Sequence, residues 1–506
     1  MSFISVEFLV FCLLLFLGYF LAPRKQQWMV LLFANAVFYV SGGFFSVAFL
    51  AVTCVSAYIC AVQVERVGET YREIRKNTCR TREEKQQNKA QCTKIQKRMM
   101  TACFVLNFGI WMVVKYVQLP IFPLGISFYT FMAMGYCIDV YRGKYPAEKN
   151  PARFALFLSF FPHMVQGPFS RYNNLKETLY EPHDFSWERL RQGGIRILWG
   201  IFKKTVVAYR FGMAAEAVFA LQKPCGCVYV LVLMVSLALQ LYADFSGYMD
   251  IAAGICQCLG IRLEENFRQP FFSKSIDEFW RRWHITLGAW FRDYVFYTVS
   301  VGKRTQNLAR KCREKFGIGF SRMLPSYLAL FLVWTATGLW HGTAWNFLLW
   351  GWMNLFFIAA GIFFAPVYKK CREFLHIREE SRWWRLVQMV RTFLLFGYME
   401  MVSGASSARE ALRLTRLLFV WEAPEAVESL PELTGLGACD VFVLLFGILL
   451  MAAVDIMKEK QMDCRALFCR IPTAVRYVCL VGLVYMILLL GDIGSDASKG
   501  FMYAQF

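Results

Sequence analysis

The stretch TGLWHGTAWNFLLWG, from Thr337 to Gly351, places one histidine, His341, inside a long apolar part of the chain. An ionisable side chain at bilayer depth costs roughly 2.5–3.5 kcal/mol on insertion scales, so such a residue is first interpreted as functional. The alternative is a histidine whose ring is hydrogen-bonded within a helix bundle, or one that lies near the lipid headgroups. The stretch alone supports both interpretations, and the surrounding sequence has to decide between them.

The composition indicates an all-α, multi-pass membrane protein. Hydrophobic residues make up 57% of the 506 residues, and aromatic residues make up 17%. The apolar runs are about twenty residues long, which is the length of a spanning helix rather than of a barrel strand. We expect about 11–13 transmembrane or re-entrant helices in a single integral-membrane domain that covers residues 1–506.

The net charge of +20 would also suit a nucleic-acid-binding protein, but its distribution argues against that class. Lys and Arg occur in short blocks between apolar runs, as expected for loops that are held on the cytoplasmic side.

The first apolar run, residues 3–22, carries Glu7 and lacks a basic start, so it predicts an uncleaved anchor rather than a signal peptide. An acidic stretch from Glu422 to Asp440 is expected outside, as are both termini.

Residues 65–98 form a long charged stretch with eleven Lys or Arg and five Glu. Many of these charges have helical spacing. We therefore predict a solvated, helical loop on the cytoplasmic side.

The seventeen cysteines are scattered, and no CxxC pair is present. They are typical of small buried hydrophobic residues rather than of a disulfide framework or a zinc site. We expect no metal and no permanently bound cofactor.

The stretch FLSFFPHMVQGPFSRYNNL, residues 157–175, is too short and too broken by proline and glycine for a simple span. Irregular backbone at membrane depth is tolerated only where protein buries it or where it lines a watery cavity. The pattern predicts a re-entrant segment with His163 at the edge of a cavity. A histidine in an interfacial loop is the alternative.

Two carboxylates, Asp244 and Asp250, lie in the apolar stretch LQLYADFSGYMDIAAGI, residues 239–255. Unpaired carboxylates are costly in such surroundings. We expect each to pair with an arginine of the following segment, and a direct chemical role is the alternative.

That following segment, ENFRQPFFSKSIDEFWRRWHITLGAWFRDYVFYT, is too polar to cross lipid alone. On a helix that starts near Ser275, four apolar residues share one face, while Asp277 with Arg281 and Glu278 with Arg282 have the spacing of ion pairs. Such a helix lies at the interface or dips into the protein beside a water-filled vestibule. It carries His284, which is either functional or a bystander in an aromatic belt. The shared face comprises Trp283, Leu287, Trp290 and Tyr294.

After a basic loop at residues 303–322, spans are expected near residues 325–340 and 344–364. Gly338 and Gly342 flank the pair Trp340–His341. Glycines at these positions permit a close backbone approach or a break in the helix, which lets the imidazole face a cavity.

A neutral imidazole can take a proton from an attacking hydroxyl and return it to a leaving group. The sequence lacks the hydrolase motif GxSxG, a P-loop and a dinucleotide fingerprint. The residues therefore leave two classes open: proton-transfer catalysis on groups that other molecules bring, or a proton-coupled transporter of envelope precursors.

Several ordered motifs carry a resemblance to a known family. They are LQLYADFSGYMDIAAGI, NFRQPFFSKSIDEFWRRWHITLGAWFRDYVF, TGLWHGTAWNFLLWG, FFPHMVQGPFSRY and the terminal GFMYAQF. Together they resemble the membrane-bound O-acyltransferase superfamily, and more narrowly its bacterial branch with the alginate O-acetylation and teichoic-acid D-alanyl transfer proteins. Most of the motifs lie in residues 120–365, which we expect to hold the catalytic core.

The resemblance implies a site and a reaction. His341 matches the principal catalytic histidine, and His284 matches the second polar position; Arg281 or Trp283 would help His284 to orient the accepting hydroxyl or to stabilise the thioester oxyanion. The implied reaction moves an acyl group from a cytoplasmic thioester, acetyl-CoA or an acyl carrier protein, to hydroxyls of an extracellular polysaccharide, through a central tunnel. An extracytoplasmic SGNH-type partner and a bacterial plasma-membrane location are also implied. The supporting candidates are Arg281, Trp283, Trp340, Asp244, Asp250 and His163.

One departure from the family pattern leaves the substrate open. Where the alginate-type pattern has a short Pro-Leu-Gly-Gly turn, this chain reads YTVSVGKR and continues into a longer basic loop. Acetyl transfer is our first hypothesis, and D-alanyl transfer to teichoic acid is the alternative.

Overall fold

The computed structural model describes residues 1–79, 81–117, 123–220, 226–421 and 436–492. Within these ranges the chain is helical, without strands, and one isolated bridge joins Phe267 and Trp283. The chain divides into two compact units, residues 1–194 with 252–264 and residues 195–251 with 265–506. The acidic residues Glu422, Glu425, Glu428 and Glu432 and the terminal motif GFMYAQF lie outside the described ranges.

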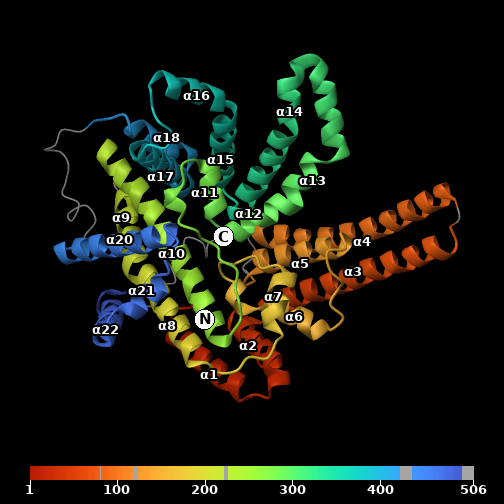
Figure 1. Cartoon of the computed structure of the whole chain (residues 1–506), viewed down its shortest axis with the longest axis horizontal. Coiled ribbons are helices and arrows are strands. Elements are labelled where there is room, and N and C mark those ends of the chain that lie inside the picture. The colour runs from red at the N-terminus through yellow and green to blue at the C-terminus, as the bar shows by residue number, and fades with distance from the viewer. Residues whose placement is uncertain (80, 118–122, 221–225, 422–435, 493–506) are drawn as a thin grey trace. The chain divides into compact units, whose positions relative to one another are not determined.

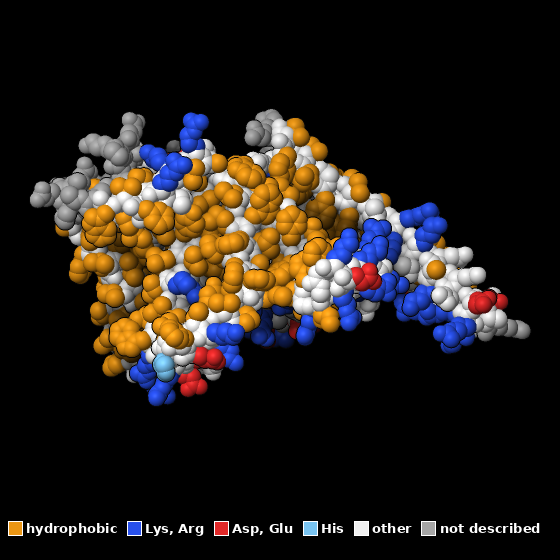
Figure 2. Space-filling view, turned by 90° about the horizontal axis from the view of Figure 1, so that it is seen from above, with side chains coloured by type: hydrophobic (Ala, Val, Ile, Leu, Met, Phe, Trp, Pro, Cys, Tyr) orange, Lys and Arg blue, Asp and Glu red, His pale blue; other side chains and the backbone are white. Residues whose placement is uncertain are grey.

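Seven helices in the described ranges are long and apolar enough to cross a bilayer, so the chain is a multi-pass membrane protein. Their outward faces are apolar: Leu14 of a shorter apolar helix is 65% exposed, and Leu449 and Leu489 are 69% and 76% exposed. Figure 2 shows hydrophobic side chains over a broad part of the visible face, with Lys and Arg gathered toward its margins. The total of spanning and re-entrant helices stays a prediction.

The first unit is built around two long antiparallel helices, α3 (Phe44–Asn77) and α4 (Arg82–Tyr116), which lie side by side (Figure 1). The predicted helical character of residues 65–98 is confirmed, because these residues extend both helices. Thr81 begins α4 with a capping box, in which its hydroxyl accepts from the Glu84 N–H. The remaining helices of this unit are α1 (Val6–Leu21), η1 (Arg24–Gln26), α2 (Gln27–Ser41), α5 (Ile126–Tyr141), α6 (Pro151–Ser159), η2 (Phe161–His163) and α7 (Tyr172–Leu179).

Two helices contribute to both units, α8 (Trp187–Phe202) and α10 (Cys227–Leu259). The second unit packs its part of α10 against α17 and α18 through a buried apolar cluster that includes Leu233, Leu237 and Met401. Its other elements are η3 (Lys203–Ala208), α9 (Tyr209–Ala220), η4 (Pro270–Phe272), α11 (Ile276–Arg282), α12 (Ile285–Phe291), η5 (Arg292–Phe296), α13 (Tyr297–Ser300), α14 (Lys303–His341), α15 (Trp345–Phe363), α16 (Ala365–Phe374), α17 (Arg382–Gly404), α18 (Ala408–Leu417), α20 (Ala438–Glu459), α21 (Cys464–Arg470) and α22 (Thr473–Leu490).

Three glycines set the close packing of α14 against α15. A Cβ on Gly338 would lie 2.7 Å from the carbonyl oxygen of Phe347, and one on Gly351 would lie 2.4 Å from that of Trp334. A Cβ on Gly342 would lie 1.9 Å from the Phe347 ring. The predicted close approach and helix break at the Trp340–His341 pair are therefore confirmed.

Two sequence expectations about helices were wrong. Residues 303–322, expected as a loop, form the first half of α14, which bends at Gly317 (φ 79°). The helix expected to continue from Ser275 past Tyr294 stops at Arg282 and restarts at Ile285. Backbone hydrogen bonds from Arg268 N to Arg282 O (2.9 Å) and from Ile285 N to Asn266 O (3.0 Å) tie a distant extended segment to this break.

Candidate active site

His341 is the last residue of α14, and the chain turns sharply after it. Gly342 is extended (φ −164°), and α15 begins at Trp345. The imidazole is 6% exposed and lies edge-on to the rings of Trp340 and Trp350, each 4.8 Å away between centroids. The histidine is thus buried inside the second unit rather than exposed at its lipid-facing surface.

Tryptophans from three helices form the wall beside His341. Trp280 of α11 lies 5.0 Å from Trp334 and 5.6 Å from Trp350, measured between ring centroids. The indole N–H groups of two of these tryptophans donate hydrogen bonds: Trp280 Nε1 donates to Asn354 Oδ1 (2.8 Å), and Trp350 Nε1 donates to Glu400 Oε1 (3.0 Å). These bonds fix the indoles, so the wall has one defined shape.

His284 occupies the break between α11 and α12. Its backbone is left-handed (φ 46°, ψ 49°), which costs a non-glycine residue on the order of 1–3 kcal/mol. The side chain is 2% exposed, and its ring packs edge-on to Phe245 of α10 at 4.9 Å. Because the helix breaks at His284, the imidazole direction is set by the left-handed backbone of this residue, and the ring is buried in the protein.

Asn266 determines which nitrogen of His284 carries the proton. The Thr286 N–H and hydroxyl donate to Asn266 Oδ1 at 3.1 and 2.8 Å, which identifies that atom as the amide oxygen. His284 Nδ1 lies 3.4 Å from the same oxygen, so Nδ1 must be the donor. Burial lowers the pKa of His284 to about 3, so the ring is neutral. Its Nε2 therefore carries a lone pair and acts as an acceptor.

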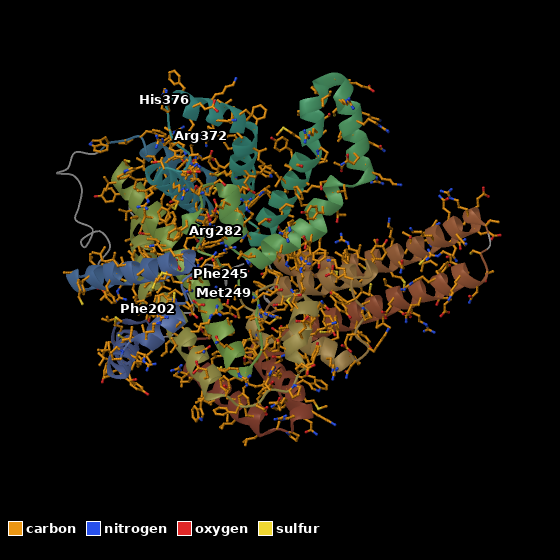
Figure 3. The ribbon with its side chains drawn as sticks, viewed as in Figure 1. Phe202, Phe245, Met249, Arg282, Arg372 and His376 are labelled. Atoms are coloured by element: carbon orange, nitrogen blue, oxygen red, sulfur yellow. The ribbon has the colours of Figure 1, made fainter. Side chains whose placement is uncertain are left out.

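Two side chains of α10 contact His284 and its partner Asn266. Phe245 contacts the His284 ring, and Met249, one turn later, accepts a hydrogen bond from Asn266 Nδ2 (3.2 Å to Sδ). Figure 3 labels both residues together with Arg282, which bonds Glu278 at 2.9 Å and Glu459 at 2.7 Å. Arg282 thereby joins α11 to α20 and holds the end of α11 in place.

Trp340 connects the two histidines. Its ring centroid is 4.8 Å from that of His341 and 6.2 Å from that of His284. Two residues that are far apart in the sequence thus contact one indole in a buried, aromatic-lined part of the second unit. The structure brings together His341, His284 and Trp340 of the predicted site.

Asp244 and Asp250 pair with residues that precede α10, and the expectation of an arginine from the following segment was wrong. Asp250 accepts from Arg196 Nε (2.8 Å) and Lys203 Nζ (2.7 Å), and Asp244 pairs with Lys204. Lys203 and Lys204 open the π-helical turn η3, which projects consecutive side chains toward α10. A small polar cavity of about 40 Å³ lies beside these pairs and reaches Asn266. It has room for about one water molecule.

The other candidates have different surroundings. The ion pairs predicted for Arg281 with Asp277 and for Arg282 with Glu278 are confirmed. The Arg281 side chain is 64% exposed, so the polar support of buried His284 comes from Asn266 instead. Trp283 is fully buried and stacks on Phe279 at 5.4 Å. His163 lies in the first unit and is fully buried, and its place at the edge of a cavity stays a prediction.

Sequence reasoning missed Asn266, Trp350 and Glu400. Asn266 follows the acidic pair Glu264–Glu265 in an extended segment, where nothing marks it as the partner of a histidine 18 residues later. Trp350 lies within the TGLWHGTAWNFLLWG stretch, and its helical spacing from His341 cannot be read across the break at Gly342. Glu400, a carboxylate in an apolar run, was the one detectable residue of the three.

Comparison with known proteins identifies the domain that holds the His284 side of this site. The membrane-bound O-acyltransferase family model matches residues 148–311. These residues form a membrane-bound O-acyltransferase domain. The match includes His163, Asp244, Asp250 and His284 and ends before His341, whose place in the candidate site therefore rests on its contacts.

Relatives of this chain include two named as probable alginate O-acetylases. The protein of Pseudomonas syringae pv. tomato is 39% identical over 45% of this chain and 40% of its own length. The protein of Azotobacter vinelandii is 33% identical over 69% of this chain and 66% of its own length. A teichoic acid D-alanyltransferase of Bacillus subtilis is 28% identical over 54% of this chain and 67% of its own length. The chain thus matches less than two thirds of the length of either alginate O-acetylase.

Proposed function

We propose that this protein is an O-acyltransferase that moves an acyl group, acetyl in the first instance, from a thioester donor to hydroxyls of a cell-envelope polysaccharide. The observation that carries the proposal is the contact of two buried histidines with one tryptophan, Trp340, in a chain that contains a membrane-bound O-acyltransferase domain. Buried imidazoles suit proton transfer to and from a hydroxyl.

In the proposed reaction, His341 is the general base. The acceptor oxygen attacks the thioester carbonyl carbon while His341 takes the hydroxyl proton. The carbon–sulfur bond then breaks, and protonated His341 returns that proton to the leaving thiolate. His284 orients the acceptor through Nε2, which accepts from a neighbouring hydroxyl of the polysaccharide, because the proton of the attacking hydroxyl goes to His341. The tautomer held by Asn266 favours this role over oxyanion stabilisation, since an Nε2 without a proton cannot donate.

The donor is proposed to be acetyl-CoA or an acyl carrier protein, which acts as a substrate from the cytoplasmic side. The tryptophan rings that pack against His341 suit a small, uncharged acyl group. The relatives named as O-acetylases support acetyl, and those named as D-alanyltransferases support D-alanyl as the alternative.

We further propose a bacterial plasma-membrane location with both termini outside, a central tunnel through which donor and acceptor meet, and an extracytoplasmic SGNH-type partner that completes transfer. The positive charges of residues 66–98 support the orientation, because Lys and Arg hold short loops in the cytoplasm. The transporter alternative requires Asp244 and Asp250 to carry protons. Their pairing with Lys204, Lys203 and Arg196 favours a structural role for both carboxylates.

Mass analysis of envelope polymers tests the function in cells. Strains with the wild-type gene, without it, and with His341→Ala are compared at matched protein levels in the membrane. We expect an ester-linked acyl group, with the mass of acetyl, only in the wild-type strain. Equal acylation in the His341→Ala strain would overturn the proposal, and the mass of alanine on the polymer would select the D-alanyl alternative.

A further inference from the structure

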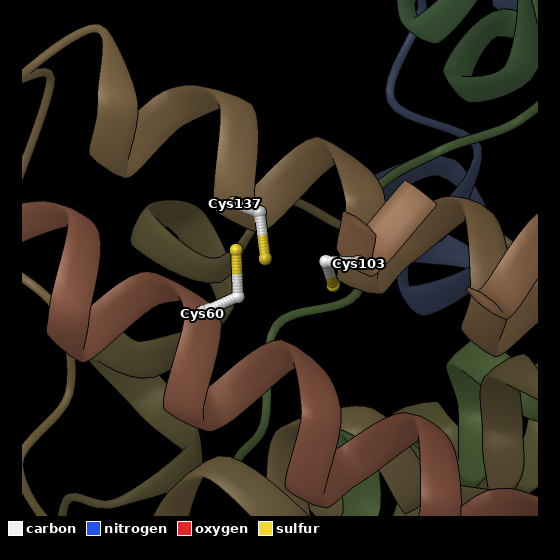
Figure 4. A group of neighbouring side chains, drawn as sticks. All are labelled: Cys60, Cys103 and Cys137. Atoms are coloured by element: carbon white, nitrogen blue, oxygen red, sulfur yellow. The ribbon is translucent and has the colours of Figure 1, made fainter. Parts of the chain in front are cut away.

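Three cysteines of the first unit meet inside the membrane part of the chain. Cys60 of α3, Cys103 of α4 and Cys137 of α5 are 6%, 6% and 0% exposed, and their sulfurs all lie within 4.8 Å of one another. Figure 4 shows the sulfurs of Cys60 and Cys137 side by side, with Cys103 next to them. No spacing in the sequence predicts this group, because each helix contributes one cysteine.

The separation of the sulfurs fits a three-coordinate metal ion. An ion that lies about 2.3 Å from each of three thiolates places the sulfurs about 4 Å apart. The observed group, with all sulfurs within 4.8 Å, reaches this geometry when each sulfur moves by a fraction of an ångström. Side-chain rotation alone supplies such a movement, so the three helices can keep their packing.

The surroundings favour a soft ion. The Met100 thioether lies 3.8 Å from Cys60 Sγ, and the Asn107 amide nitrogen donates to Cys103 Sγ at 3.6 Å. The same nitrogen donates to Ser56 Oγ (3.0 Å) and Cys103 O (2.9 Å), so one of its two N–H groups is shared with the Cys103 sulfur. In the part of the chain that the structure describes, the group contains no histidine or carboxylate ligand. Thiolate and thioether ligands suit Cu(I) as well as Zn(II). Structural Zn(II) is almost always four-coordinate, so a group of three thiols favours three-coordinate Cu(I).

The cluster lies near the charged ends of its helices. Cys60 and Cys103 are each five residues, about 7.5 Å along a helix axis, from Glu65 and Arg98. Those ends lie together, since Gln96 Nε2 donates to Val64 O at 2.8 Å. An ion that enters from the Lys- and Arg-rich side therefore crosses only one to two helical turns of apolar protein.

We propose that Cys60, Cys103 and Cys137 form a binding site for one Cu(I) ion. Each thiol that ligates the ion loses its proton to water as the sulfur–copper bond forms, and no electron is transferred. The N–H of Asn107 donates to the resulting thiolate of Cys103 and offsets part of its charge. The site lies in a different unit from His284 and His341, so it does not depend on the proposed acyl transfer.

Titration of the purified full-length protein with Cu(I) tests this site. Anaerobic competition against a chromogenic Cu(I) chelator gives the stoichiometry and affinity, and X-ray absorption at the copper edge gives the ligands. We expect one tight equivalent with three sulfur ligands, lost in the variant with Cys60, Cys103 and Cys137 all changed to serine. The matched control changes Cys371, Cys439 and Cys479, which are exposed, to serine and should keep the tight equivalent.

Two further measurements keep the test decisive if the triple variant fails to fold. Asn107→Leu leaves all three sulfurs in place and is expected to lower Cu(I) affinity about tenfold. Cu(I) should also raise the thermal-unfolding midpoint of the wild type but not that of Cys137→Ala. Loss of the tight equivalent in the exposed-cysteine control, nitrogen or oxygen ligands in the absorption spectrum, or binding of Zn(II) in preference to Cu(I) would each overturn the proposal.

Discussion

At the scale of single residues, the most informative contact is that between Asn266 and His284. The Asn266 carbonyl oxygen is fixed by Thr286, and it therefore imposes one tautomer on a buried, neutral imidazole. Of the two roles that the family resemblance implied for His284, this geometry favours orientation of the hydroxyl.

Changing Asn266 to leucine removes the acceptor for His284 Nδ1–H. We expect acyl transfer to slow by roughly 10- to 100-fold, because a lost buried hydrogen bond is worth about 1–3 kcal/mol. Asn266→Asp keeps an oxygen at the same place and should retain more activity, with a pH profile that shifts upward because a carboxylate raises the pKa of His284. Steady-state rates from pH 5 to 9 provide the measurement. Equal losses in both variants would show that Asn266 only supports packing.

His163 gives a residue-scale prediction about acid stability. Burial lowers the pKa of His163 to about 3, against about 6.5 in an unfolded chain. As pH falls below about 6.5 the unfolded chain gains a proton that the folded chain cannot accept, so stability decreases; at pH 5 this one histidine costs about 2 kcal/mol. We expect His163→Leu to lose less thermal stability than the wild type between pH 7.5 and pH 5.

The control for this prediction is His376→Asn, at an exposed histidine (Figure 3) whose positive φ of 53° asparagine tolerates. This variant should follow the wild type at both pH values. An unchanged acid sensitivity in His163→Leu would contradict the account of a buried neutral ring.

At the scale of elements, the α14–α15 hairpin depends on glycines at its contact. Gly342→Ala puts a Cβ 1.9 Å from the Phe347 ring, so the ring or the turn must move, at a cost of about 1–3 kcal/mol. Gly361→Ala, in α15 with open space around it, should be neutral or slightly stabilising. Thermal-unfolding midpoints of the two variants are measured in detergent. Equal midpoints would contradict the tight packing of the hairpin at Gly342.

The pairs that join η3 to α10 give a second element-scale prediction. Lys204→Ala leaves the Asp244 carboxylate buried without its cation and should cost about 3–5 kcal/mol. The double variant Lys204→Met with Asp244→Leu should recover most of that stability, since apolar replacements of a buried pair are often neutral. Failure of the double variant to recover, together with loss of activity in it, would favour a chemical role for Asp244.

The elements also show what the sequence could predict. The spans and the helical character of residues 65–98 followed from long apolar runs and charge spacing, which are local properties. The break at His284 did not, because residues 266–268 cause it by pairing with residues 282–285 from a distance. Likewise residues 303–322 are too polar to suggest a span, yet they extend α14 as helix.

At the scale of the whole molecule, the sequence predicted the membrane class and the membrane-bound O-acyltransferase domain that matches residues 148–311. The catalytic roles of His341 and His284 stay predictions. The sequence could not predict the neighbours of these histidines, because Asn266 and Trp350 reach them only through tertiary packing. The cysteine cluster shows the same limit: three helices each contribute one thiol, and nothing in the spacing joins them.

The central claim is that His341 and His284 act together in acyl transfer. The direct measurement is the rate of labelled acetyl transfer from a thioester to a polysaccharide acceptor by the purified protein in liposomes, with its extracytoplasmic partner where transfer requires one. We expect His341→Ala and His284→Ala each to lower the rate by about 10²- to 10⁴-fold, and the double variant to lose little more, while Trp383→Ala, at an exposed tryptophan, keeps the wild-type rate. Full activity in His341→Ala, with an unchanged unfolding midpoint, would contradict the account.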